Sequence, residues 1–228
     1  MADLPVELPN GLDDRLSRIL DVEGKIPRAL GALGRVAGRD VVLLDSPDGL
    51  RARQLRELGA RVAVVAGGSS STALADASAD VVISLWSSFL GAVASELAEA
   101  ERILRPGGRL LVVHDYGRDD VSHLHGVPPE PRAWSRPSGP FLSNEFKVRV
   151  LHCFWTFESM ADCRDFLGTA FDEPGRALAA GLKRPRLSYK VAVYHRTFGS
   201  EAAGLVSSGS DKAGSEAAGS AAHARAAE

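Results

Sequence analysis

The chain has 228 residues, is 45% hydrophobic and carries a formal net charge of −2 at pH 7. Its length is sufficient for one core of ordinary size. Its charge gives no long-range attraction to phosphate backbones or anionic lipid, so we expect neither a nucleic-acid partner nor a membrane partner. No apolar run reaches the roughly 18 residues of a membrane span. The N-terminus is acidic where a signal peptide would be basic and then apolar, so we expect a cytoplasmic protein.

In chain order, apolar runs alternate with helical repeats of apolar residues. We expect strands at residues 18–22, 40–45, 61–67, 80–86 and 109–115, and helices at residues 25–36, 49–58 and 89–104. The last of these helices stops before Pro106, Gly107 and Gly108, a strong helix-ending signal. Because the strands are apolar throughout and alternate with helices, they indicate a mostly parallel sheet covered on both faces, which is a doubly wound α/β fold.

The rest of the chain predicts an antiparallel edge and a tail. Residues 119–141 are rich in Pro, Ser, Gly and His and predict a long surface loop or lid. Residues 146–157 and 187–198 predict two long strands that enclose a helix, which brings the sheet to seven strands with an antiparallel edge hairpin. Residues 200–228 are mostly Ala, Gly and Ser and predict a disordered tail after one domain over residues 1–199.

Ligands of a doubly wound sheet bind at the carboxyl ends of its strands, so the residues there are the candidates for a site. They are Asp21 and Gly24 after the first strand, Asp45 and Ser46 after the second, Gly67 and Ser69 after the third, Trp86 after the fourth, and His114 and Asp115 at the end of the fifth. An acid after the second strand can accept hydrogen bonds from both hydroxyls of a ribose. Asp45 fits that role, and it equally fits a helix N-cap because Ser46 and Pro47 follow it.

Four segments, read in order, resemble a class I methyltransferase that uses S-adenosylmethionine. They are ILDVEG, VVLLDSPDGLRARQLRELGARVAVVAG, LADASADVVISLW and EAERILRPGGRLLVVHDY. The resemblance implies that Asp45 holds the ribose and that Ser46 belongs to the Ser-Pro pair that commonly follows this acid. It also implies roles for residues at the other strand ends. Asp21 and Gly24 line the methionine part of the cofactor, Ser69 and Trp86 border the adenine, and Gly67 or Gly68 stands where an acid often meets the adenine.

The loop after the first expected strand departs from the family pattern. Gly24 takes the place of the last glycine in the usual acid-x-Gly-x-Gly-x-Gly loop, the other glycines are missing, and Glu23 adds a side chain and a negative charge. In a second assignment, residues 40–45 form the family's first strand and everything upstream is an added helix. Asp45 and Pro47 then replace glycines, and no ribose acid follows at Ala66. We prefer the first assignment because it accounts for every strand.

The leading hypothesis is methyl transfer from S-adenosylmethionine to a small-molecule acceptor by a bacterial enzyme. Of the fifth-strand residues His114 and Asp115, either one orients the acceptor or takes its proton, or both serve only the fold, with His114 satisfying a backbone group and Asp115 capping a turn. No metal is expected, because His123 and His125 lack a third ligand with convincing spacing. A second hypothesis, motivated by the shortened glycine loop, is a catalytically inactive methyltransferase-like module that binds a partner. A nicotinamide-dependent enzyme is a weaker third, and a homodimer is compatible with the sequence.

Overall fold

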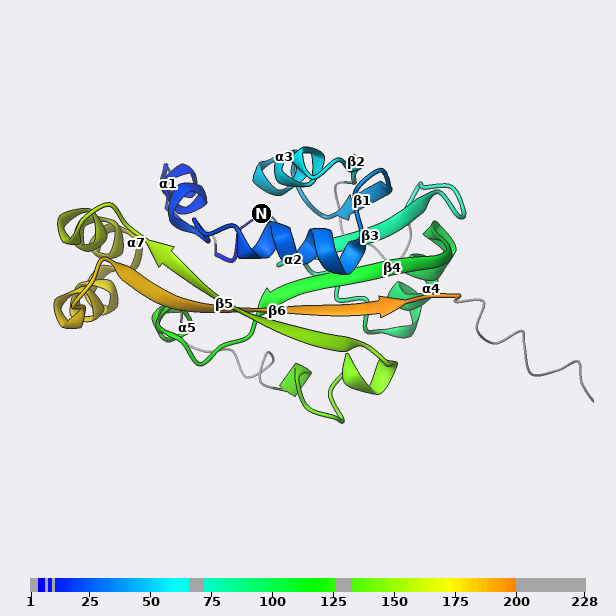
Figure 1. Ribbon diagram of the computed structural model, residues 1–228. Helices are drawn as coiled ribbons and strands as arrows, with labels where there is room; N and C mark the ends of the chain where they lie inside the picture. The colour runs from blue at the N-terminus through cyan, green and yellow to red at the C-terminus, as the bar shows by residue number, and fades with distance from the viewer. Residues whose placement is uncertain (1–3, 7, 10, 66–71, 126–132, 200–228) are drawn as a thin grey trace, which may run out of the picture.

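The computed structural model describes residues 4–6, 8–9, 11–65, 72–125 and 133–199. Within these ranges the chain forms a sheet flanked by helices (Figure 1). The strands are β1 (Asp40–Leu44), β2 (Arg61–Val65), β3 (Ala79–Leu85), β4 (Leu104–Asp115), β5 (Lys147–Thr156) and β6 (Arg186–Thr197). The helices are α1 (Leu12–Ile19), α2 (Lys25–Gly34), α3 (Leu50–Glu57), α4 (Ala94–Ile103), α5 (Asp120–Leu124) and α7 (Met160–Gly181), with a short 3₁₀ helix at Leu142–Asn144.

The sheet has the strand order β2-β1-β3-β4-β6-β5. The first four strands in this order are parallel, and β6 is antiparallel to both β4 and β5. The prediction of a doubly wound, mostly parallel sheet with an antiparallel edge hairpin is therefore confirmed. The described residues form six strands in this sheet, one fewer than expected.

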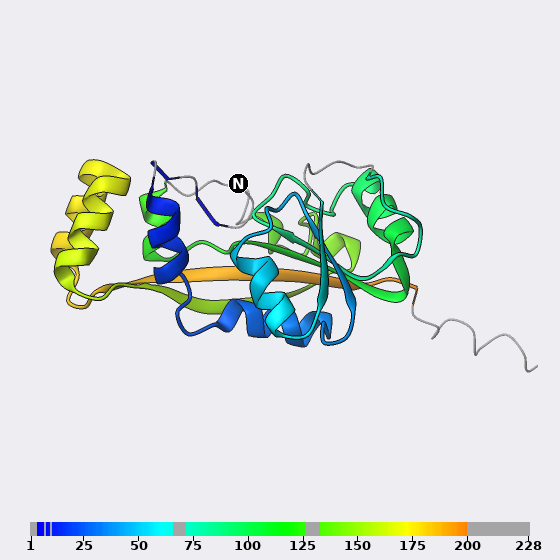
Figure 2. The same ribbon diagram turned by 90° about the horizontal axis from the view of Figure 1, so that it is seen from above.

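The two faces of the sheet have separate cores. On one face, apolar residues of α2 and α3 such as Ile26, Leu30 and Leu55 pack against the sheet, and this core continues to Trp155 on β5. On the other face, Ile103 of α4 packs against the sheet together with Phe141. Figure 2 shows α2 and α3 on one side of the sheet, α4 on the other, and α1 and α7 where β5 and β6 extend beyond the parallel strands.

The prediction of a strand at residues 18–22 is wrong. The chain is helical as far as Ile19, and Leu20 makes only an isolated antiparallel bridge to Trp155 of β5. Leu12, Leu16 and Ile19 are buried and follow one another at spacings of four and three residues, which is the period of a helix face. As a result β1 lies directly between β2 and β3 and pairs with both.

The loop expected over residues 119–141 is not a surface loop at its described ends. Val121 of α5 is fully buried, and so is Phe141. The Phe141 ring stacks on Tyr194 of β6 with ring centroids 3.9 Å apart, and Trp134 meets Phe141 edge-on. These two ends therefore belong to the core. Residues 126–132 and the tail expected over 200–228 lie outside the described residues.

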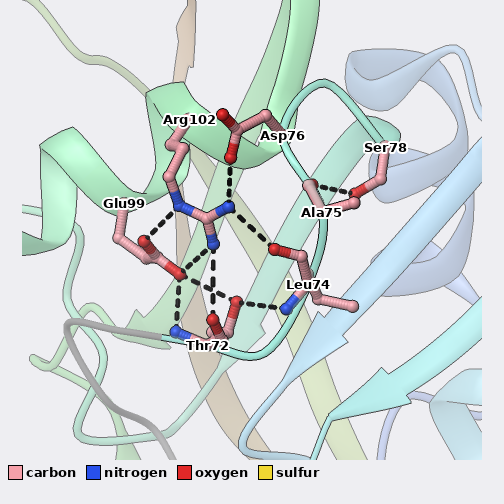
Figure 3. Close-up of polar contacts among 7 residues, drawn as sticks. All are labelled: Thr72, Leu74, Ala75, Asp76, Ser78, Glu99 and Arg102. Atoms are coloured by element: carbon pink, nitrogen blue, oxygen red, sulfur yellow. Dashed lines mark hydrogen bonds and ion pairs between the residues drawn. The ribbon is translucent and has the colours of Figure 1, made fainter.

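An ion pair between the buried Glu99 and the half-buried Arg102 fixes the turn that leads into β3. The Arg102 guanidinium of α4 donates to Glu99 and, at 2.5 Å, to Asp76. Glu99 also accepts from the backbone nitrogen of Thr72 at 2.6 Å and from its hydroxyl at 2.8 Å (Figure 3). The hydrogen bond from Arg102, followed by those from Thr72, lowers the pKa of Glu99 from 4.5 to about 2 despite its burial.

Replacing this carboxylate should destabilise the fold. We expect Glu99→Gln to lower the free energy of unfolding by about 1 to 3 kcal/mol at pH 7, because charge-assisted hydrogen bonds are lost from a buried group. Since the pKa of Glu99 is lowered in the folded state, its contribution is present above pH 4.5 and is lost as the pH falls toward about 2. Urea unfolding at several pH values measures both effects. The exposed neighbour Glu101→Gln is the control, and equal stability of the two variants would contradict the expectation.

Candidate functional site

The candidate site lies at the carboxyl ends of β1, β3 and β4. Asp45 follows β1 with a backbone φ of 52°, in the left-handed region, and its nitrogen donates to the Val65 carbonyl at 2.7 Å. Its carboxylate is 3.5 Å from the Ser88 hydroxyl. Ser46, next along, is buried. The chain then enters α3 after Gly49, so the turn between β1 and α3 has the sequence Asp-Ser-Pro-Asp-Gly.

The structure brings Trp86 and Asp115 together. The indole nitrogen of Trp86, after β3, donates to Asp115 Oδ1 at 3.0 Å, and the Tyr189 hydroxyl of β6 donates to the same oxygen. Burial raises the pKa of Asp115 from 3.8 to about 6, and the two hydrogen bonds only partly oppose that shift. Burial, with Asp115 nearby, also raises the pKa of Tyr189 well above its usual value. Asp115 is therefore a carboxyl group that can exchange a proton near neutral pH.

Arg51 is the residue of this region that the sequence analysis missed. It lies in the first turn of α3, is 1% exposed, and places its guanidinium carbon 5.9 Å from the centre of the Trp86 ring. It also donates to the Gln54 side chain at 2.8 Å. Sequence reasoning assigns an arginine on a helix to the solvated face, since this residue type is rarely fully buried. The cation instead covers the indole at the end of β3.

Asp21 and Gly24 are not at the ends of the parallel strands. The Asp21 nitrogen donates to the Phe154 carbonyl of β5 at 3.0 Å. Its two carboxylate oxygens accept from the backbone nitrogens of Lys25 at 3.0 Å and Ile26 at 2.6 Å, so the side chain caps the start of α2. Gly24 is the residue before that helix, with φ of 66°. Both residues serve the α2 start beside β5.

His114 and Asp115 point to opposite faces, as neighbours on a strand do. The His114 ring meets Trp134 edge-on with centroids 4.9 Å apart, and burial lowers its pKa from 6.5 to about 4. Its Nε2 has no hydrogen-bond partner among the described residues. Only one of the two residues can therefore face an acceptor from a given side of the sheet, and which of them does so stays a prediction.

Other expected features fall outside or away from this region. Gly67 and Ser69 lie outside the described residues. In the described ranges, no three His, Cys, Asp or Glu side chains gather as a metal ion would require, and no helix has the length and apolar character to cross a membrane. Burial, with Asp21 nearby, raises the pKa of the Cys153 thiol to about 12, so it is unreactive at neutral pH.

Comparison with known proteins agrees with the sheet topology. Residues 22–112 match a family described as a methyltransferase domain. The structure is similar to one described as a type II methyltransferase from Anaeromyxobacter dehalogenans, with a TM-score of 0.50 and 20% identity over 75% of this chain and 95% of that one. The fold is that of a class I S-adenosylmethionine-dependent methyltransferase. The match and this methyltransferase fold support methyl transfer from S-adenosylmethionine as the general chemistry of similar proteins, and they identify no acceptor.

Two further methyltransferase structures align over most of their length. One is from Bacillus halodurans, with 14% identity and a TM-score of 0.44 over 75% of this chain and 97% of that one. The other is from Aquifex aeolicus, with 15% identity and a TM-score of 0.44 over 80% of this chain and 92% of that one. Both TM-scores are below 0.5, so the fold assignment does not depend on them. The sequence matches no curated protein.

The residues present do not fit S-adenosylmethionine in the way the resemblance implies. The family match begins at residue 22, upstream of β1, as in the first assignment. The strand of that assignment is nevertheless missing from the sheet, and β1 lies beside β3 as the second assignment expects. The ribose role of Asp45 remains a prediction, and the position of β1 beside β3 does not favour it. In the first assignment Asp21 is occupied as a helix cap; in the second, Asp45 and Pro47 stand where glycines are needed.

The raised pKa of Asp115 predicts a measurable effect on stability. A folded-state pKa above the unfolded value stabilises the protein at low pH, and that stability is lost as the pH rises from about 4 through 6. We expect Asp115→Asn, which keeps the Oδ1 acceptor for Trp86 and Tyr189, to raise the free energy of unfolding by about 2 to 3 kcal/mol at pH 8. Urea unfolding from pH 4 to pH 8 tests this. Asp14→Asn on the exposed side of α1 is the control, and parallel pH profiles of wild type and Asp115→Asn would contradict it.

Proposed function

We propose that this chain is a methyltransferase-like binding module that neither binds nor turns over S-adenosylmethionine. The observation that carries the proposal is the position of Asp21. Both of its carboxylate oxygens accept backbone N–H groups of α2, so the side chain is held at the start of that helix, beside β5, and not aimed at the end of β1 where a cofactor of the family would place its methionine ammonium group. A charge-assisted hydrogen bond contributes about 1.5 to 3 kcal/mol, so moving this side chain away from the helix start would cost a similar amount.

The turn after β1 supports the same conclusion by its chemistry. Its backbone includes Pro47, which has no N–H to donate to a carboxylate ligand. Asp45 adds a negative charge where the methionine carboxylate of a cofactor would approach, whereas Asp48 is paired with Arg56 at 2.6 Å. Beyond the turn, the buried Arg51 side chain covers Trp86, which the resemblance assigns to the adenine. A bound cofactor would have to displace this cation.

A second candidate function is methyl transfer to a small-molecule acceptor, and Asp115 is the observation that favours it. Its carboxyl group, with a pKa near 6, is held by Trp86 and Tyr189 at the end of β4. A group with this pKa can accept a proton from a hydroxyl or amine acceptor. This candidate requires that the chain still binds the cofactor, so a single binding measurement separates the two functions.

Isothermal titration of the full chain with S-adenosylmethionine, and separately with S-adenosylhomocysteine, provides that measurement. We expect no saturable heat at ligand concentrations up to about 1 mM, because the cofactor would meet the Asp45 carboxylate and a turn whose Pro47 has no N–H to donate. A class I methyltransferase of established activity, titrated in the same buffer, is the positive control. Saturable binding of either ligand with a 1:1 stoichiometry would overturn the proposal in favour of the second candidate.

The capping role of Asp21 predicts a stability effect that does not depend on ligand. We expect Asp21→Ala to lower the free energy of unfolding by about 1 to 2 kcal/mol, the usual cost of losing a helix cap. Urea unfolding with circular dichroism detection measures it. Glu57→Ala, an exposed acid at the end of α3, serves as the control. An Asp21→Ala variant as stable as the wild type would show that the carboxylate is free for another role.

A further inference from the structure

The outer edge of β5 forms one wall of a groove whose other wall is α2. The groove has a volume of about 450 Å³. Its floor is apolar, with residues such as Leu33 and Leu151, and Lys25, Arg28, Arg149 and His152 add basic side chains. The residues that line it include no acid, although Lys25 forms an ion pair with Glu23 at one end. The groove is therefore an apolar channel with a positive rim.

The backbone of β5 has hydrogen-bonding groups that point away from β6, toward the groove. In an antiparallel strand, alternate residues direct both N–H and C=O away from the neighbouring strand. The carbonyls of Phe154 and His152 point away from β6, because they accept from the Asp21 nitrogen at 3.0 Å and from Lys25 Nζ at 2.7 Å. By the same two-residue period, Val150 and Val148 direct their backbone groups outward. Along the described chain, β6 is the only strand that pairs with β5 apart from the Leu20 bridge.

The charges around the groove decide what can pair with this edge. A second copy of the chain, pairing β5 with β5, would bring Lys147 and Arg149 of one copy near the same residues of the other, and like charges across strands are destabilising. An extended segment with acidic side chains at every second position would instead meet Arg149 and Arg28. Its backbone would pair with Val148 and Val150, which is the strand-addition mode of peptide recognition.

We infer that the β5 edge binds an extended peptide segment in which acidic and apolar residues alternate. The added strand lies between β5 and α2, its main chain supplies affinity, and the basic rim selects acidic side chains. The inference gives the binding module proposed above a surface and a class of partner. The surface is distinct from the ends of the parallel strands. A failed peptide titration therefore leaves the cofactor titration and its conclusion unchanged.

In the test, an acetylated and amidated octapeptide of alternating valine and glutamate is titrated into the full chain. Isothermal titration calorimetry measures the heat of binding. We expect saturable binding below about 1 mM, and new protection of the Val148 and Val150 amides against hydrogen exchange. The same peptide with N-methyl groups on alternate amides should not bind, because methylation removes its donors. An octapeptide of alternating valine and lysine should not bind either, because the groove rim is positive.

Variants of the chain locate the site. We expect Arg149→Glu to weaken binding of the glutamate peptide by about tenfold or more, and the exposed Arg164→Glu on α7 to leave it unchanged. Val150→Pro should abolish binding, since an edge residue with an outward N–H tolerates proline but then cannot donate. Circular dichroism melting curves establish that each variant is folded. The inference is overturned if the glutamate peptide does not bind, if it binds as well when N-methylated, or if Arg149→Glu and Arg164→Glu behave alike.

Discussion

The direct pairing of β1 with β3 is the constraint from which the rest of the domain follows. Hydrogen bonds between Val41–Leu44 and Val81–Ser84 close the centre of the sheet and leave no place for a strand from residues 18–22. That segment must then leave the sheet centre, and it joins the β5 edge through Leu20 and Asp21. From there α2 starts and crosses the same sheet face as α3 (Figure 1). One strand pairing thus makes Asp21, to which the family resemblance gives a cofactor contact, the cap of a helix.

The polar groups at the ends of β3 and β4 form one cluster around a shared carboxylate. Asp115, Trp86 and Tyr189 share one carboxylate oxygen, and Arg51 lies over the indole. Buried polar groups are costly unless they are satisfied, so such a cluster strongly specifies its own geometry. The members of this cluster satisfy one another without a ligand, so the fold alone is sufficient to retain them. Similarity of fold and retention of polar groups are therefore separate from retention of activity.

Much of the fold was predictable from the sequence, because buried parallel strands are apolar throughout. Strands near 40–45, 80–86 and 109–115, and the terminal hairpin, all appear in the sheet. The error at residues 18–22 arose because a short apolar run fits a strand and the last turn of a helix equally well. Its neighbours Leu12 and Leu16 carried the helical spacing that could have corrected it.

The candidate site was less predictable, because it depends on how distant strands align. Trp86 and Asp115 were expected at neighbouring strand ends, and they do meet. Tyr189 could not be placed, since its contact with Asp115 depends on how β6 aligns with β4. The two residues are 74 positions apart in the sequence. Arg51 was missed because composition rules assign arginine to solvent. Residue types at strand ends can be read locally, whereas their partners across the sheet cannot.

The position of β6 in the sheet has a consequence for how the domain forms during synthesis. It is the last described strand to be translated, yet it lies between β4 and β5 and supplies Tyr189 to one core and Tyr194 to the other. Phe141, which seals the second face, stacks on Tyr194. Neither core can close while β6 is still inside the ribosome. Partly made chains will expose both apolar faces, and in that state aggregation competes with folding.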